Sequence, residues 1–277
     1  MPMTLIGLPY DASSSFQRGA AAAPAAIRRA LASASSNLWT EGLVDLGAPG
    51  VLGDAGDVDV GDGEDGAAAR AAIERGVAAV LAGGGGGGGR PIALGGDHSV
   101  TYPALRAVRR AHPRGLAVVQ FDAHPDLYDA FEGDRHSHAS QMARAMEEGL
   151  ADRLVQVGIR TMNGHQRAQA DRFGVEVVDV RTWSRGAALA ERLVFDVPVY
   201  VTFDVDALDP AFAPGVSHRE PGGLTVRQAL DAIHAIRAPA LAAADVVELN
   251  PSNDVNGVTA MVCAKVVKEL AGRMLET

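Results

Sequence analysis

Short apolar segments alternate along the chain with longer, alanine-rich segments, and this alternation limits the possible folds more than any other feature. Strands that alternate with helices build a parallel sheet that is covered by helices on both faces. The sequence therefore predicts an α/β fold. The expected strands are residues 3–8, 91–94, 116–121, 154–157, 175–178, 197–203 and 243–247, and the expected helices are 24–34, 67–81, 100–111, 141–148, 226–236 and 258–270.

The last of these helices has an apolar stripe at helical spacing. Its members are Val258, Met261, Val262, Val266 and Leu270. Lys265, Lys268 and Glu269 fall off the stripe. Such a stripe is typical of a helix that packs against a core, so we expect it to be buried rather than to bind a partner.

The composition limits the function classes. The chain has 277 residues, of which 47% are hydrophobic and 21% are charged, which is enough length and apolar content for a large core. No internal repeat or shift in composition marks a boundary, so residues 1–277 are expected to form a single domain. The formal net charge of −9 argues against a surface that binds nucleic acid or an anionic membrane, and it agrees with a small cationic substrate.

Three further features bear on location and flexibility. Cys263 is the only cysteine, which excludes an intramolecular disulfide and favours a reducing compartment. The first ten residues carry no Lys or Arg, and their apolar run stops at Asp11, too early for a signal peptide or a membrane span. A cytoplasmic location is therefore expected. The glycine run 83–89 lacks the spacing and the Lys-Ser/Thr of a phosphate loop, which favours a flexible linker.

Side chains that bind metals follow three of the expected strands. Strand 116–121 runs into Asp122, His124 and Asp126, which the two-residue period of a strand would point to one side. Strand 197–203 runs into Asp204 and Asp206, and strand 91–94 is followed by Gly95-Gly96-Asp97-His98-Ser99. Open α/β sheets bind ligands at the carboxyl ends of their strands. These clusters are therefore expected to meet in one crevice.

Four carboxylates and two imidazoles would then share one crevice. The carboxylates would repel one another unless cations neutralised their charge. An oxygen-rich set with one His per ion suits Mn²⁺ better than structural Zn²⁺, and Ni²⁺, Co²⁺ and Fe²⁺ remain open. The alternative for each cluster alone is a solvated loop aspartate or a histidine bonded to a neighbour. The joint pattern favours a metal pair.

These motifs resemble the signatures of the ureohydrolases, the arginase and agmatinase family. The matching segments are GGDHS (95–99), DAHPD (122–126) and DVDALDPAFAPG (204–215), in the family's order. The similarity extends from IGLPYD (6–11) to DVVELNP (245–251) and is greatest to the plant-type arginases, which share DAFEG (129–133), SHAS (137–140) and GVSHREPGGL (215–224). It implies a three-layer α/β/α fold around a mostly parallel sheet of about eight strands.

The resemblance also implies a set of roles. His98 and Asp126 would bind one Mn²⁺, His124 and Asp206 would bind the other, and Asp122 and Asp204 would bridge the two. A hydroxide that bridges the ions would attack the guanidino carbon. Glu248 matches the family's guanidinium-binding residue, and His138 matches its proton-shuttling histidine. Glu248 could instead cap the turn at Asn250-Pro251, and His138 could be an exposed loop residue.

Substrate choice is less constrained by the sequence. Gly158-Ile159-Arg160 is followed by Thr161-Met162-Asn163, so the acidic residue by which animal-type arginases read the amino-acid head group is missing there. The candidates for reading the substrate's tail are Tyr128, Ser137, Asn163 and His218. His112, His136, His165 and His234 are expected to be surface residues.

The plant-type match favours L-arginine as the substrate, with agmatine or another guanidino compound as the alternative. A metal-dependent deacetylase would have fewer carboxylates, and an inactive homologue would have lost a ligand. The resemblance further implies a homo-oligomer, either a trimer or a hexamer.

Overall fold

Eight parallel strands form one central sheet in the computed structural model, which describes residues 2–63, 65–83, 89–184 and 189–277. The strand order is β2-β1-β3-β8-β7-β4-β5-β6. The strands are β1 (Met3–Leu8), β2 (Leu52–Asp57), β3 (Arg90–Gly95), β4 (Ala117–Phe121), β5 (Arg153–Ile159), β6 (Glu176–Asp179), β7 (Val199–Asp204) and β8 (Leu241–Val247). The expected α/β/α fold with about eight parallel strands is confirmed.

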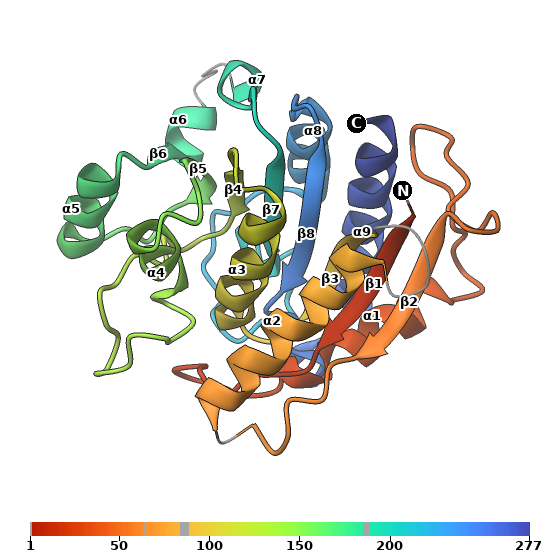
Figure 1. Cartoon of the computed structure of the whole chain (residues 1–277), viewed down its shortest axis with the longest axis horizontal. Coiled ribbons are helices and arrows are strands. Elements are labelled where there is room, and N and C mark those ends of the chain that lie inside the picture. The colour runs from red at the N-terminus through yellow and green to blue at the C-terminus, as the bar shows by residue number, and fades with distance from the viewer. Residues whose placement is uncertain (1, 64, 84–88, 185–188) are drawn as a thin grey trace.

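Helices cover both faces of the sheet (Figure 1). One face packs against α1 (Ala23–Leu31), α8 (Val226–Ala235) and α9 (Val258–Glu276), and the other packs against α2 (Gly66–Ala82), α3 (Thr101–Ala111) and α4 (Gln141–Glu147). The remaining α-helices within the described ranges are α5 (Gly164–Phe173) and the short α6 (Val180–Ser184) and α7 (Leu189–Arg192). Two apolar cores result, one on each side of the sheet.

The chain order creates a crevice in the middle of the sheet. β1, β2 and β3 form one side, the chain then crosses to β4, β5 and β6 on the other side, and β7 and β8 return to fill the gap between β3 and β4. The carboxyl ends of β3, β8, β7 and β4 therefore lie next to one another. A switch in strand order of this kind is where open α/β sheets bind ligands.

The expected strands all occur, but β2 is an addition to them. Its sequence, LGDAGD, is largely exposed and lies at the sheet edge beside β1. Arg28 of α1 forms ion pairs with Asp54 and Asp57 on β2, which holds this polar strand in place. Most of the glycine run 83–89, expected to be a linker, falls on residues 84–88, which lie outside the described part of the chain.

Helix α9 departs from the expected division into apolar and charged faces. Val258, at one end of the stripe, is 44% exposed, whereas Glu269, off the stripe, is only 2% exposed. The segment before β2 packs over α9 and explains this difference: Glu269 accepts a hydrogen bond from the backbone N–H of Glu41, and Lys268 donates to the carbonyl of Asn37. A charged residue can be buried when its partners are supplied by another segment.

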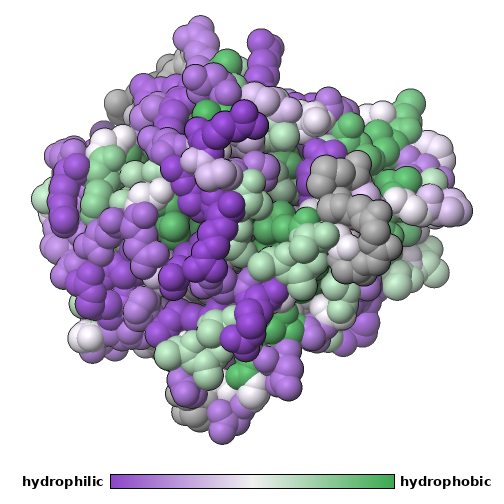
Figure 2. Space-filling view, viewed as in Figure 1, coloured by the Kyte–Doolittle hydropathy of each residue, from purple (hydrophilic) through white to green (hydrophobic). Residues whose placement is uncertain are grey.

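The outer surface is mainly polar over α4 and α5, and a paler, more apolar band follows the alanine-rich helix α2 (Figure 2). That band consists of exposed alanines such as Ala67, Ala71 and Ala78 rather than large side chains. No helix within the described ranges has the length and the apolar character that a membrane span requires.

Candidate active site

The six residues proposed as metal ligands meet at the carboxyl ends of β3, β4 and β7. His98, Asp122 and Asp204 bring ligand atoms within 4.8 Å of one another, and so do Asp122, His124 and Asp206. Asp122 belongs to both groups, which is the arrangement expected of a bridging carboxylate. Asp126 completes the set, with its Oδ2 lying 3.0 Å from Nδ1 of His98. These six residues are called the cage below.

The residues converge through turns and not through the strand period that was expected. β4 ends at Phe121, and Asp126 has a left-handed backbone with φ of 51°. After β7, residues Val205–Ala207 form a short 3-10 turn in which Asp204 accepts a hydrogen bond from the N–H of Asp206. The grouping of Asp122, His124 and Asp126 that the two-residue period predicted is present, but it is caused by the turns after the strand and not by strand geometry.

His98 provides the test of whether this cage fits metal ions. Its Nδ1 atom is buried, lies 3.1 Å from Asp122, 3.0 Å from Asp126 and 3.2 Å from Asp204, and makes no hydrogen bond to any described group. Its other nitrogen, Nε2, is held by the hydroxyl of Thr202 at 2.9 Å. A ring nitrogen that faces three carboxylate oxygens, with its partner nitrogen fixed from behind, is the geometry of a metal ligand.

The electrostatics agree with this conclusion. Burial and the neighbouring charge of Asp122 raise the pKa of Asp126 to about 6. Burial and the charges of Asp206 and Asp122 raise the pKa of Asp204 well above its usual range. Carboxylates that resist ionisation together are stabilised in their charged form by divalent cations. The donor set, with four carboxylates and two imidazoles, therefore fits a pair of divalent ions.

Glu248 and His138 form a hydrogen-bonded pair beside the cage. Oε1 of Glu248 lies 2.8 Å from Nδ1 of His138 and also accepts the backbone N–H of His98 at 2.8 Å. Glu248 does not cap the following turn, because the side chain of Asn250 accepts the N–H of Ser252 there. His138 is 8% exposed, so the alternative of an exposed loop histidine is also wrong.

The two ring nitrogens of His138 have different partners, Glu248 at Nδ1 and Ser15 at Nε2. The backbone N–H of Ser15 donates to this atom at 3.2 Å, and the Ser15 hydroxyl lies at 2.9 Å. A backbone N–H can only donate, so this contact needs a lone pair on Nε2 and places the ring proton on Nδ1. Burial opposes a second proton, yet the charges of Glu248, Asp97 and Asp126 outweigh it and raise the pKa of His138 to about 9. The contact from Ser15 thus favours the singly protonated ring, whereas the neighbouring carboxylates favour the doubly protonated one.

A pocket of about 320 Å³ opens over the cage and receives these side chains. His124, Asp126, Asp204, Asp206, His138 and Glu248 line its floor, and Tyr128 and His218, two of the expected tail-reading residues, line its wall. Ser137 does not line it; its hydroxyl bonds to the N–H of Ala139. Asn163 does not line it either, and instead holds the Tyr128 hydroxyl at 2.6 Å from its Nδ2.

Several lining residues were not expected from the sequence. Ser15, Phe131, Thr161, Gln166 and Glu220 complete the wall. Glu220 supplies an acidic side chain to the same pocket that Thr161 lines. Ser15 lies within the stretch from 6 to 251 over which the sequence resembles the family, and Glu220 lies within the plant-type string 215–224.

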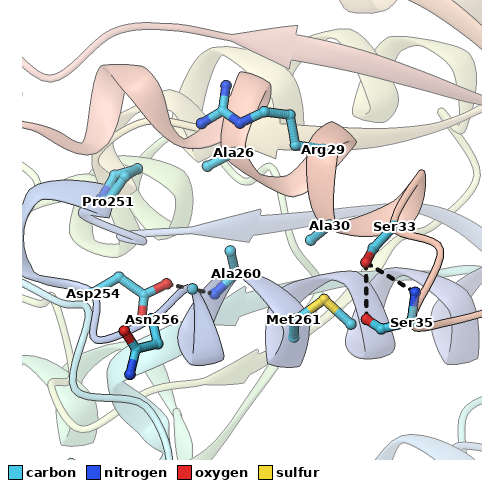
Figure 3. Close-up of a pocket in the computed structure, with 11 residues that line it drawn as sticks. Ala26, Arg29, Ala30, Ser33, Ser35, Pro251, Asp254, Asn256, Ala260 and Met261 are labelled. Atoms are coloured by element: carbon cyan, nitrogen blue, oxygen red, sulfur yellow. Dashed lines mark hydrogen bonds between the residues drawn. The ribbon is translucent and has the colours of Figure 1, made fainter.

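A second hollow, of about 400 Å³, lies between α1 and the start of α9 (Figure 3). Its one carboxylate, Asp254, is already used, because it accepts the N–H groups of Thr259 and Ala260 at the start of α9. Arg29 and small side chains make up much of the rest. This hollow has no converging donors, so the chemistry belongs to the smaller pocket.

The comparison with known proteins agrees with the geometry. A family model described as the arginase family matches residues 1–272. The chain belongs to the arginase family. It is 46% identical to the mitochondrial arginase 1 of Arabidopsis thaliana over 98% of this chain and 80% of that protein. It is 35% identical to the agmatinase of Serratia proteamaculans over 96% of this chain and 85% of that protein.

A solved structure of an arginase-family member supports the same conclusion. The arginase from Medicago truncatula superposes with a TM-score of 0.91 at 42% identity, covering 99% of this chain and 87% of that one. The expected cytoplasmic location is contradicted, since several of the matched plant arginases are named mitochondrial. The absence of a leader-like apolar run, on which the expectation rested, was too weak a basis for assigning a compartment.

Proposed function

We propose that the chain is an arginase that hydrolyses the guanidino group of L-arginine to urea and L-ornithine. The observation that carries the proposal is the position of the Glu248 carboxylate, which lies on the floor of the pocket beside the six-residue cage and is paired with His138. The 46% identity to an Arabidopsis arginase supports the same substrate class. The chain would act as a single ureohydrolase domain.

Two Mn²⁺ ions per chain are proposed to be held by His98 and Asp126, by His124 and Asp206, and by the shared carboxylates Asp122 and Asp204. When bound, such ions supply a water of lowered pKa and polarise the group under attack. Manganese is favoured because oxygen donors dominate the cage and no thiolate is present in it. Elemental analysis of protein loaded with Mn²⁺ would test the stoichiometry.

Glu248 would bind and orient the substrate. Among the described residues, both hydrogen bonds to its carboxylate use Oε1, which leaves Oε2 to accept a guanidinium N–H. A charge-assisted contact of this kind fixes the plane of the guanidinium and turns its carbon toward the cage.

His138 would handle the proton of the departing group. Hydrolysis adds water to the guanidino carbon and breaks its bond to the ornithine nitrogen, which leaves as an amine and must gain a proton. His138 lines the pocket, and a proton on its Nε2, which would replace the N–H contact from Ser15, could pass to that amine while Glu248 stabilises the charged ring through Nδ1.

Agmatine is the second candidate substrate. The chain is similar to an agmatinase, and the wall residue Glu220 could pair with an ammonium group, which both arginine and agmatine carry. The lining includes no Lys or Arg for an α-carboxylate, so neutral donors such as Gln166 and Thr161 would have to read it. Urea release should be measured for arginine, agmatine, guanidinobutyrate and guanidinopropionate with Mn²⁺-loaded protein. A much higher kcat/KM for agmatine than for arginine would reject the arginase proposal.

A homo-oligomer, as a trimer or a hexamer, stays a prediction that rests on the family resemblance. Light scattering coupled to size-exclusion chromatography would determine the state.

A further inference from the structure

A third set of donors lies in the pocket outside the six-residue cage. His138, His218 and Glu248 each offer a ligand atom, and these atoms lie within 4.8 Å of one another. The two imidazole rings have centroids 4.9 Å apart. The hydroxyl of Ser15 lies between them, at 2.9 Å from Nε2 of His138 and 3.4 Å from Nε2 of His218. Four polar side chains from four separate segments, Ser15, His138, His218 and Glu248, therefore converge on one spot.

We propose that His138, His218 and Glu248 form a third metal site, which takes one zinc ion and blocks the pocket. Two imidazoles and one carboxylate are a donor set that zinc binds in proteins, with a fourth position left for water or a hydroxyl. The cage differs, since it offers one imidazole and several carboxylates to each ion. Nitrogen-rich and oxygen-rich donor sets select different metals, so the two sites differ in their preferred ion.

The charge of the pocket favours such an ion. The four carboxylates of the cage balance two divalent cations, and this leaves the carboxylate of Glu248 uncompensated apart from His138. A site that binds a guanidinium has a negative electrostatic potential, and this potential also attracts a divalent cation. This step rests on the proposed function, because it assumes a cage loaded with metal, and so does the competition with substrate that follows from it.

The position of the site determines its effect. A zinc ion bound there would take a carboxylate oxygen of Glu248, the proposed guanidinium ligand, and one ring nitrogen of His138, which would give up its present hydrogen bond. Zinc and substrate could therefore not bind together, so the ion would act as a reversible inhibitor that competes with the guanidino compound. The same three side chains could instead be no more than an ion pair of His138 and Glu248 beside a packed His218, and the experiment separates the two.

The experiment uses the full chain loaded with Mn²⁺, and zinc chloride as the probe. After equilibrium dialysis against micromolar Zn²⁺, elemental analysis should give two Mn and one Zn per chain. His218→Asn should lower the affinity for this zinc by about 10-fold or more, since loss of a ligand costs at least as much as the 10- to 100-fold typical of a supporting residue. The manganese content should not change. His112→Asn, on a histidine that follows α3 far from the cage, is the matched control and should bind zinc as the parent does.

A crystal of the Mn²⁺-loaded protein soaked in Zn²⁺ gives a second readout that needs no variant. An anomalous peak at the zinc edge between His138, His218 and Glu248 is expected. The proposal is overturned if zinc only replaces manganese in the cage, if no third ion binds, or if His218→Asn folds and binds zinc as tightly as the parent. Urea release in the absence of zinc tests the arginase proposal separately, so either proposal can fail without the other.

Discussion

The hydroxyl of Thr202 lies 2.9 Å from Nε2 of His98, on the side of the ring opposite the cage. Both residues are buried, and Thr202 is in turn near Thr101, whose hydroxyl donates to Asp245 at 2.8 Å. The contact fixes the rotation of the His98 ring, so that Nδ1 faces the three carboxylates. Groups that orient a metal ligand in this way contribute measurably to the affinity for the metal.

Thr202→Val should therefore weaken metal binding at the His98 site by about 10- to 100-fold, since valine keeps the shape and removes the hydroxyl. Retained Mn²⁺ per chain after dialysis, together with activity as a function of Mn²⁺ concentration, measures the effect. Thr202→Ser keeps the hydroxyl and serves as the control, which should bind close to the parent value. Equal metal retention in the valine variant and the parent would mean that the cage alone orients His98.

Glu248→Gln should leave both ions bound and reduce kcat/KM by roughly 30- to 1000-fold, which corresponds to about 2–4 kcal/mol for a charge-assisted contact. The structure adds a second cause of this loss. The amide can still accept the N–H of His98, but it cannot stabilise a positive charge on His138. The kcat value should therefore fall as well as the apparent affinity.

Glu220→Gln is the matched control for that variant, because it makes the same chemical change on the wall of the same pocket. It should raise KM more than it lowers kcat. If Glu248→Gln kept the full kcat/KM for every guanidino substrate, another residue would have to bind the guanidinium.

Ser15→Ala should lower kcat by about 3- to 10-fold, the effect of one neutral hydrogen bond of about 0.5–1.5 kcal/mol. The hydroxyl of Ser15 lies 2.9 Å from Nε2 of His138, while its backbone N–H contact survives the substitution. Because the missing contact is to the nitrogen proposed to exchange the proton, the pH dependence of kcat should shift, with little change in metal content. Ser15→Thr should restore both values, and an unshifted pH profile in the alanine variant would limit Ser15 to a packing role.

Glu41→Gln should change the stability of the protein only above the acid range. Hydrogen bonds from Arg227 and Lys265 lower the pKa of Glu41 to about 2, against an ordinary value of 4.5. A lowered folded-state pKa stabilises the fold above pH 4.5, and this contribution is lost as the pH falls toward 2. The difference in free energy of unfolding between parent and variant should therefore be constant from pH 7 to 5 and shrink below pH 4.5. A difference that grew as the pH fell would contradict the assignment of these partners.

The sequence predicted the central part of the sheet well, because buried parallel strands are continuous apolar runs such as those of β4 and β7. It did not predict β2, whose exposed sequence is rich in Gly and Asp and is typical of a loop. This segment is a strand because it pairs with β1 and because Arg28 forms an ion pair with Asp54. Helix α5 could have been found, since Asn163 and Gln166 form a capping box that is visible in the sequence.

The site divides in the same way. The proposed ligands follow apolar strands, and that adjacency was enough to group them. Ser15 and Glu220 come from long loops, and no local pattern tells which wall of a pocket a loop will form. The burial of Glu269 likewise depends on Glu41, which is distant in sequence, and the periodicity of α9 could not reveal it.

Asp126 (φ 51°) and Glu248 (φ 66°) have left-handed backbones, so the residues proposed to act in the reaction also lower the stability of the fold. A conformation of this kind costs a residue with a side chain on the order of 1 kcal/mol or more, which glycine escapes. A laboratory selection for thermostability alone, without a requirement for urea release, should therefore enrich variants with glycine or asparagine at these two positions. It would enrich sturdier proteins that had lost a proposed metal ligand or the guanidinium contact, so any directed evolution of this chain must select for turnover at every round.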